Sequence, residues 1–280
     1  MEDTVPSQPP KTVIISGGTD GMGRATALER IARGDHVTVI GSNEAKGRAL
    51  LDQAAHPNLR FLQADLSSIA ETERVIARIG EQHDTLDALA LFANRMSPKR
   101  KETADGLEST FALYYLSRYL LSYRLRPLLD ASPDPVIINV AGVGNTAGRI
   151  YWDDPQLTRR YGQVRAQLQA GRANDLLGVV FAGQAESKAR YVLYHPGFTR
   201  SGADGHPNPL VRGSIKLLAK FFARSVADAV QPIVQWIDRP PTDSLCAIDR
   251  GRPVEKSLKT LDPDAAARLA AYTENLLRSR

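Results

Sequence analysis

The stretch that decides the fold is residues 12–23, which read Thr-Val-Ile-Ile-Ser-Gly-Gly-Thr-Asp-Gly-Met-Gly. The first four residues are all β-branched, which is typical of a buried strand. The glycine-rich turn lets a pyrophosphate approach the backbone, and a helix expected over residues 24–33 directs its free N–H groups toward the same place. The stretch therefore predicts a strand–turn–helix unit that binds a dinucleotide.

The alternation of strand and helix continues along the chain. Further strands are expected over residues 36–40, 59–63, 88–92, 135–140, 190–194 and 244–248, and further helices over residues 43–54, 68–82, 106–129, 173–185, 210–237 and 263–278, the last capped by Asp262. Helical segments between strands imply right-handed βαβ crossovers and a parallel sheet. We therefore expect an α/β fold of a single domain, a doubly wound parallel sheet (Rossmann fold).

The domain is expected to cover residues 11–280, after a disordered N-terminal tail of residues 1–10. Residues 202–209 are rich in Gly, Pro and Asn, so the segment of about residues 200–240 is interpreted as a substrate lid with helices.

Composition and charge exclude several classes of protein. The chain of 280 residues has 36 Lys+Arg against 31 Asp+Glu, and the basic residues are scattered, so nucleic acid is not an expected partner. The lone Cys246 excludes a disulfide framework and favours a reducing, cytoplasmic location. No apolar run is long enough to predict a membrane span. The five histidines show no metal-ligand spacing with carboxylates, so no metal is expected.

The glycine spacing is G-x-x-x-G-x-G, and with this spacing the chain resembles the short-chain dehydrogenase/reductase family from residue 11 onward. Asp65-Leu66 matches the family's adenine-contacting Asp, and residues 92–94 stand in place of its Asn-Ala-Gly turn. His195-Pro196-Gly197 with Ser201 matches the segment that closes over the nicotinamide, and we expect His195 to anchor that loop. Residues 250–277 resemble the tail of retinol-dehydrogenase-like members.

The turn and the resemblance together imply a set of cofactor-binding residues, which are Gly17, Thr19, Asp20, Gly21, Met22, Gly23, Ser42, Asp65, Leu66, Ala93, Asn94, Pro196, Gly197 and Ser201. An NAD-selective site needs a carboxylate at the end of the second strand, where this chain has residues 40–43, Ile-Gly-Ser-Asn. Ser42, with Arg24 and Lys46, is instead suited to a 2′-phosphate, so the expected cofactor is NADP rather than NAD.

The resemblance implies catalysis by a Tyr-x-x-x-Lys pair, an orienting Ser and a relay Asn, and the chain departs from this pattern. Gly142 takes the place of the Ser, for which Asn145 or Thr146 is the candidate substitute, and Tyr114 takes the place of the Asn. In one register Tyr161 is the acid and Arg165 replaces the Lys. A second register leaves Gln167 and Gly171 at these two positions.

Two functions remain open. The first is an NADP-dependent oxidoreductase, of carbonyl reductase or alcohol dehydrogenase type, that acts on a fairly apolar small molecule. In this reading Tyr161 is the proton donor, Arg165 binds ribose and Asn145 orients the substrate. The second is a relative that binds the dinucleotide-pocket ligand but has lost redox catalysis, as a cyclase, dehydratase, regulator or scaffold. A homo-oligomer is possible through the Tyr- and Leu-rich residues 106–129.

Overall fold

The computed structural model describes residues 9–197 and 225–280. Nearly all of the predicted tail, the first part of the predicted lid and Ser201 lie outside the described residues. The described residues form one eight-stranded sheet in the order β3-β2-β1-β4-β5-β6-β7-β8. The strands are β1 (Thr12–Ser16), β2 (His36–Gly41), β3 (Leu59–Gln63), β4 (Ala88–Leu91), β5 (Val136–Val140), β6 (Arg190–His195), β7 (Leu245–Asp249) and β8 (Arg252–Pro253).

All strand pairs are parallel except β7 with β8, so the predicted doubly wound parallel sheet is confirmed. The chain leaves β1 toward β2 and β3 on one side and continues from β4 on the other. This reversal of strand order next to β1 opens a crevice at the carboxyl ends of the strands, where such sheets bind ligands.

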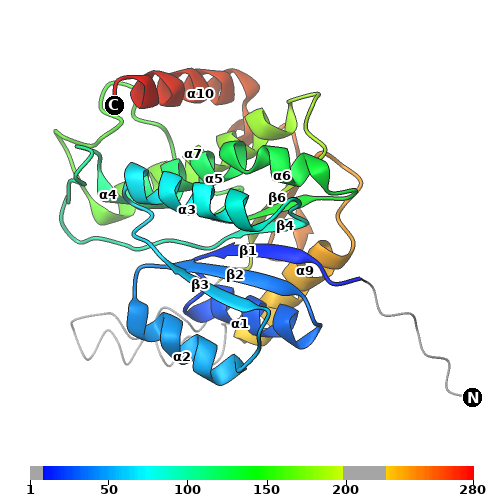
Figure 1. Ribbon diagram of the computed structural model, residues 1–280. Helices are drawn as coiled ribbons and strands as arrows, with labels where there is room; N and C mark the ends of the chain where they lie inside the picture. The colour runs from blue at the N-terminus through cyan, green and yellow to red at the C-terminus, as the bar shows by residue number, and fades with distance from the viewer. Residues whose placement is uncertain (1–8, 198–224) are drawn as a thin grey trace, which may run out of the picture.

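Helices cover both faces of the sheet (Figure 1). On one face lie α3 (Ile69–Gln82), α4 (Ser109–Phe111), η1 (Ala112–Leu116), α5 (Ser117–Arg124), α6 (Arg126–Ala131), α7 (Gln163–Ala182), the single turn η3 (Lys259–Leu261) and α10 (Pro263–Arg278). On the other lie α1 (Gly21–Ala32), α2 (Glu44–Ala54) and α9 (Val226–Asp238). Both faces of β1 are therefore covered, and residues 13–15 are completely buried.

The structure corrects two predicted helices. The helix expected to begin at Ala173 begins at Gln163, after Gly162 in an extended conformation. The helix expected over residues 106–129 is interrupted: it widens to a π-helix in η1, and α6 starts anew with Pro127 in its first turn. Wide turns of this kind are frequent at functional sites. The strand β8 and its hairpin with β7 were not predicted.

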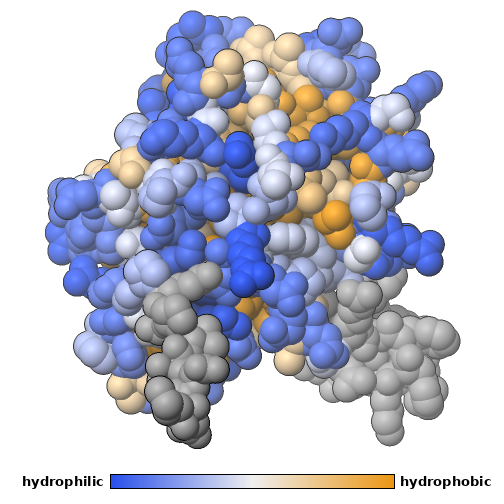
Figure 2. Space-filling view, turned by 90° about the vertical axis from the view of Figure 1, so that its right-hand side faces the viewer, coloured by the Kyte–Doolittle hydropathy of each residue, from blue (hydrophilic) through white to orange (hydrophobic). Residues whose placement is uncertain are grey.

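The described part of the predicted lid, α9, packs against the body of the protein. Ile233 and Ile237 are completely buried in the cluster formed with α1 and β1, and Tyr194 of β6 meets the ring of Trp236 edge-on at 5.1 Å. Figure 2 shows the side of the molecule on which the chain enters β1, which is largely hydrophilic with hydrophobic residues mainly in its upper half. None of the described helices is both long and apolar enough to cross a membrane.

Candidate functional site

The turn after β1 has the conformation that its glycines allow. Gly17 has φ +71°, and a Cβ there would lie 2.6 Å from the backbone nitrogen of Ala93. A Cβ on Gly23 would lie 2.4 Å from the carbonyl oxygen of Gly17. Asp20 caps α1 by accepting a hydrogen bond of 2.8 Å from the Gly21 N–H. The turn therefore brings backbone N–H groups at a helix N-terminus to an open surface, an arrangement that favours phosphate.

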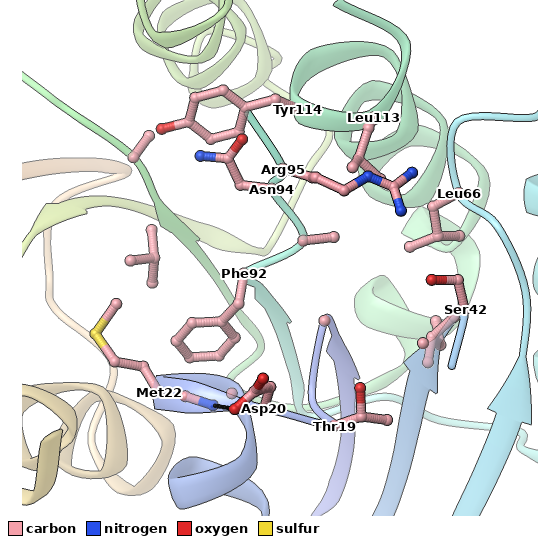
Figure 3. A pocket seen from close by; sticks show the side chains of 18 of the residues that line it. Thr19, Asp20, Met22, Ser42, Leu66, Phe92, Asn94, Arg95, Leu113 and Tyr114 are labelled. Carbon is pink, nitrogen blue, oxygen red and sulfur yellow. Dashed lines mark hydrogen bonds between the residues drawn. The ribbon is translucent and has the colours of Figure 1, made fainter. Parts of the chain in front are cut away.

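The turn opens into a cleft of about 550 Å³ at the carboxyl ends of β1, β2, β4, β5 and β6 (Figure 3). The described candidate cofactor residues lie in this one lining, which contains Gly17, Thr19, Asp20, Gly21, Met22, Gly23, Ser42, Asp65, Leu66, Ala93, Asn94, Pro196 and Gly197. The structure thus brings together residues from five separate stretches of sequence. Ser201 lies outside the described residues.

One end of the cleft is bounded by Ser42 and Asp65. Asp65 accepts hydrogen bonds from the Ser67 N–H and hydroxyl at 3.0 and 2.7 Å, and its other oxygen lies 3.9 Å from the Arg95 guanidinium. Figure 3 shows Arg95 extending along the wall toward Leu66. Arg95 was not predicted, because a single exposed Arg after a strand carries no recognisable pattern.

Near Ser42, Lys46 of α2 forms an ion pair with Asp20. The hydrogen bond from Lys46, stronger than the opposing effect of burial, holds the pKa of the Asp20 carboxyl below its usual value. Arg24, in the first turn of α1, adds positive charge close to the same carboxylate. Two cations therefore lie near Asp20, and Ser42 places a hydroxyl rather than a carboxylate at the end of β2.

The other end of the cleft is lined by Tyr114, Gly142 and His195. The Tyr114 ring lies beside Asn94 in Figure 3 and packs on the Arg118 guanidinium at 4.6 Å. Burial raises the pKa of the Tyr114 hydroxyl, against the opposing charge of Arg118, so the hydroxyl stays protonated. Tyr114 lies within the π-helix η1, and the carbonyl of Tyr114 accepts a hydrogen bond of 2.7 Å from Asn174.

Arg118 is a completely buried cation that supports this end of the cleft from behind. Its guanidinium donates to Asn139 Oδ1, to the Val140 carbonyl at 2.9 Å and to the Ala93 carbonyl at 3.0 Å. Burial lowers the pKa of Arg118 to about 10, so it remains charged at neutral pH. The side chain thereby ties α5 to the ends of β4 and β5.

The predicted catalytic residues Tyr161, Arg165 and Asn145 are not among the described residues that line the cleft. Tyr161 precedes α7 and donates its hydroxyl to the Ser97 carbonyl at 2.6 Å. Arg165 lies over the ring of Tyr151 at 4.9 Å, with Arg149 also contacting that ring at 4.8 Å. Tyr151 is therefore held by two guanidinium groups, and neither Arg149 nor Arg165 belongs to the described lining of the cleft.

Asn145 lies in the turn after β5, and its amide oxygen accepts from the Ala147 N–H at 3.0 Å. Thr146, its alternative, is exposed beside it. Trp152 is covered by the Arg268 guanidinium at 4.2 Å, which makes it an anchor between this loop and α10.

In the second register, one residue outside the described lining contacts a lining residue. Gln167 of α7 exchanges two hydrogen bonds of 3.1 Å with Asn94, a lining residue. At Gly171 and at Gly142, a Cβ would meet no described atom within 4 Å. Gln167 thus places an amide at the position of the family's Tyr. Gly171 at the position of the Lys and Gly142 at the position of the orienting Ser carry no side chain.

A pair of residues that was not predicted lies at the same end. His195 Nδ1 lies 2.7 Å from Asp249 Oδ1, and the His195 ring is 36% exposed. Partial burial pushes the pKa of Asp249 upward, but hydrogen bonds and charges of Arg250 and His195 bring that pKa below its usual value. The pair was not recognisable from the sequence because its members are 54 positions apart. The described residues hold no group of three or more metal-ligating side chains.

The chain is similar to known proteins of one family in both sequence and fold. The sequence profile of a family described as short chain dehydrogenase matches residues 11–152. Human retinol dehydrogenase 13 is 29% identical over 71% of this chain and 62% of its own length. A protein of Streptomyces sp. (strain C5), provisionally assigned as a daunorubicin C-13 ketoreductase, is 28% identical over 85% of this chain and 81% of its own.

The crystal structure of a short-chain dehydrogenase from Streptomyces avermitilis, 19% identical, superposes with a TM-score of 0.65 over 98% of both chains and shows the same fold. The chain spans between 49% and 62% of the length of three curated relatives, which are retinol dehydrogenase 13, human polyprenol dehydrogenase and a bovine dehydrogenase/reductase. The predicted resemblance, including that to retinol-dehydrogenase-like members, is confirmed. The chain belongs to the short-chain dehydrogenase/reductase family.

Proposed function

We propose that this chain is an NADP-dependent oxidoreductase, of carbonyl reductase or alcohol dehydrogenase type, that acts on a fairly apolar small molecule. The observation that carries the proposal is the single cleft into which the glycine turn, Asp65, Asn94 and residues 196–197 all open. A dinucleotide needs contacts of these kinds at both of its ends and at its pyrophosphate. The names of the relatives, as dehydrogenases and a ketoreductase, support the same class of reaction.

The residues present fit the cofactor. The backbone at Gly17 and Gly23 is packed so closely that a Cβ would collide at either position, so the turn keeps its N–H groups accessible to a pyrophosphate. Asp65 and Leu66 would hold the adenine, and Ala93, Asn94, Pro196 and Gly197 would border the ribose and nicotinamide. Ser201 remains a candidate nicotinamide contact. When bound, NADP exchanges a hydride at its nicotinamide ring.

The choice of NADP over NAD rests on charge. Ser42 stands at the end of β2, where a carboxylate would repel a 2′-phosphate. Arg24 and Lys46 supply positive charge there, and Lys46 is held in place through Asp20. A 2′-phosphate would compete with Asp20 for Lys46 and gain a second cation in Arg24.

The substrate class follows from the lining. Met22, Phe92, Leu113 and Ala141 give the cleft apolar surface on several sides. The names of two relatives refer to retinol and to a ketone of daunorubicin, both of them organic small molecules. Tyr114 would donate its protonated hydroxyl to the substrate oxygen beside Gly142, where the family has its orienting Ser.

The altered α7 positions favour one second candidate. With Gln167 and Gly171 in place of Tyr and Lys, the cleft could bind the dinucleotide without catalysing redox chemistry. Tyr161 with Arg165 as the acid pair and Asn145 as the orienting group remain the alternative for a redox enzyme, although their contacts are directed elsewhere.

The experiment is a turnover screen with NADPH and with NADH on apolar aldehydes, ketones and ortho-quinones, followed by the absorbance of the reduced nicotinamide. Wild-type protein should prefer NADPH. Ser42→Asp should reduce this preference at least about tenfold by repelling the 2′-phosphate. Ser257→Asp, the same charge change at an exposed position outside the lining, is the control. NADPH binding without turnover of any carbonyl would favour the second candidate, and equal use of NADH would refute the NADP assignment.

We also propose a cytoplasmic location, supported by the single free Cys246.

The surface proposed for a homo-oligomer is partly covered by α10 of the same chain. Tyr115 is hydrogen-bonded to Thr273 of α10 at 2.7 Å, and Tyr119 and Tyr123 line a groove closed on its other side by α10. Any homo-oligomer would therefore use surfaces other than the tyrosine stripe of η1 and α5.

A further inference from the structure

We propose that His195, oriented by Asp249, is the residue that exchanges the proton with the substrate oxygen in this cleft. The inference rests on the proposed oxidoreductase function and names its missing acid. The family supplies this proton from a Tyr, and the register that brings α7 to the cleft has Gln167 there. A neutral amide does not donate a proton in general acid catalysis at neutral pH.

Strand geometry directs His195 to the correct face of the sheet. Side chains alternate along a strand, so His195 lies on the same face as Tyr191 and Leu193 and opposite to Tyr194. Tyr191 and Leu193 pack in the cluster that contains α7, whereas Tyr194 packs in the cluster with α9. His195 is therefore on the α7 face, which carries the family's Tyr and Lys.

Strand pairing also places His195 next to the open space. Val140 pairs with Tyr194, and the Ala141 N–H donates to the Tyr194 carbonyl at 2.9 Å. His195 thus stands beside residues 141–142 on the neighbouring strand, one strand spacing of about 4.8 Å away. Gly142 leaves this space free of side chain, and Tyr114 borders it. A carbonyl oxygen there would lie between the Tyr114 hydroxyl and the His195 ring.

A tight hairpin holds Asp249 against His195. Asp249 pairs with His195 on one side and with Arg252 on the other, and only Arg250 and Gly251 connect β7 to β8. Both connecting residues have positive φ, at 51° and 83°, as the two-residue turn that suits a hairpin requires. For Arg250, which carries a Cβ, this left-handed conformation is sterically unfavourable. Its contacts with His195 and Asp249 offset the strain.

Arg250 makes these contacts with both its backbone and its side chain. Its N–H donates to the His195 carbonyl at 2.7 Å, and its guanidinium donates to Asp249 Oδ2 at 2.9 Å. The Arg250 Nε also donates to Asp249 Oδ1, at 3.2 Å, so this oxygen is shared between Arg250 and the Nδ1 side of the imidazole. Because an ionised carboxylate only accepts hydrogen bonds, Nδ1 must carry a hydrogen, and Nε2 becomes the atom that gains and loses the proton.

Carbonyl reduction with His195 as the acid transfers one hydride to the substrate carbon and one proton to its oxygen. In carbonyl reduction a new C–H bond forms with the hydride that the reduced nicotinamide supplies, and the π pair of the C=O bond moves to oxygen. The imidazolium Nε2–H bond of His195 breaks as the new O–H bond forms, which leaves a neutral imidazole with Nδ1–H directed at Asp249. In alcohol oxidation the same atoms move in reverse. Arg250 contacts the pair, and the other charged groups of the described lining are Asp20, Asp65 and Arg95.

The test compares His195→Gln with His36→Gln, which removes an exposed imidazole at the start of β2, outside the described lining of the cleft. The H195Q variant should bind NADPH within about twofold of wild type but lose about 100-fold or more in kcat, the usual contribution of a general acid. His195→Ala should regain part of its activity when imidazole is added, which a structural defect would not allow. The H36Q variant should match wild type.

Asp249→Asn tests the positioning role. It should lower kcat about tenfold, keep NADPH affinity, and change the shape of the pH profile of kcat. Wild-type turnover with unchanged kcat in H195Q, or no rescue by imidazole, would overturn the inference and leave the proposed function intact. A wild-type protein that binds NADPH but reduces no carbonyl would refute the proposed function, and the inference with it.

Discussion

Gly17 offers a sharp test of the glycine turn, because its conformation and its surroundings both exclude a side chain. Gly17→Ala would place a residue with a Cβ at φ +71°, which costs about 1–2 kcal/mol. The Cβ would also lie 2.6 and 2.8 Å from the backbone N and Cα of Ala93, which cannot rotate away. Overpacking of this kind costs about 1–3 kcal/mol. The total loss of stability is therefore about 2–5 kcal/mol.

The same overlap damages the cofactor site, because relief requires β1 and the turn after β4 to separate. Thermal unfolding should show a melting temperature at least about 4 °C lower for G17A, at about 2 °C or more per kcal/mol for a chain of this size. NADPH affinity, measured by calorimetry, should fall at least about tenfold.

Gly80→Ala is the matched control, since it adds the same methyl group in α3, where a Cβ meets no described atom within 4 Å. Removing an exposed helical glycine should raise stability by about 0.5–1 kcal/mol and leave NADPH binding unchanged. A G17A protein with wild-type stability and wild-type NADPH affinity would refute the reasoning about the turn.

Three further predictions concern residues around the cleft. Tyr161→Phe should cost at most about 1.5 kcal/mol for its hydrogen bond to Ser97 and leave kcat unchanged; loss of kcat with intact folding would restore Tyr161 as the acid. Arg118→Met should destabilise by about 3 kcal/mol or more in urea unfolding, because the carbonyls of Ala93 and Val140 lose their donor; a stable variant would contradict this role. Asp175→Asn should stabilise the protein at pH 7 but not at pH 3. Burial, against the charge of the Arg172 guanidinium 3.7 Å away, raises the pKa of Asp175 well above normal. The unfolded carboxyl ionises above about pH 4, at lower pH than the folded one, so stability falls as pH rises through that range. Equal stability differences at both pH values would contradict it.

The sequence was sufficient for the parallel strands of the sheet and for the conformation of the glycine turn, because both depend on local patterns. The run of β-branched residues at 12–15 and the glycines that follow it act within a few residues of one another, so their structure follows from short-range sterics and helix geometry. The cap of Asp262 on α10 is equally local, and its carboxylate accepts from the Ala265 N–H at 2.7 Å as expected.

The end of the cleft lined by Tyr114, Gly142 and His195 could not be predicted in the same way, because its structure depends on contacts between distant segments. Tyr161 has the spacing of a catalytic Tyr relative to Arg165, but α7 begins only at Gln163, so its hydroxyl turns to Ser97 instead. The His195–Asp249 pair depends on the register of β6 with β7. A hairpin closed by an Arg at positive φ has no recognisable sequence signal.

A calorimetric titration of the wild-type protein with NADPH and with NADH tests whether the proposed NADP site is the cleft at the carboxyl ends of the strands. We expect NADPH to bind in the micromolar range, with an affinity at least about tenfold higher than that of NADH. We also expect Gly17→Ala to weaken this binding, whereas Gly80→Ala should not. Binding of neither nucleotide, or binding that Gly17→Ala leaves unchanged, would contradict this proposal.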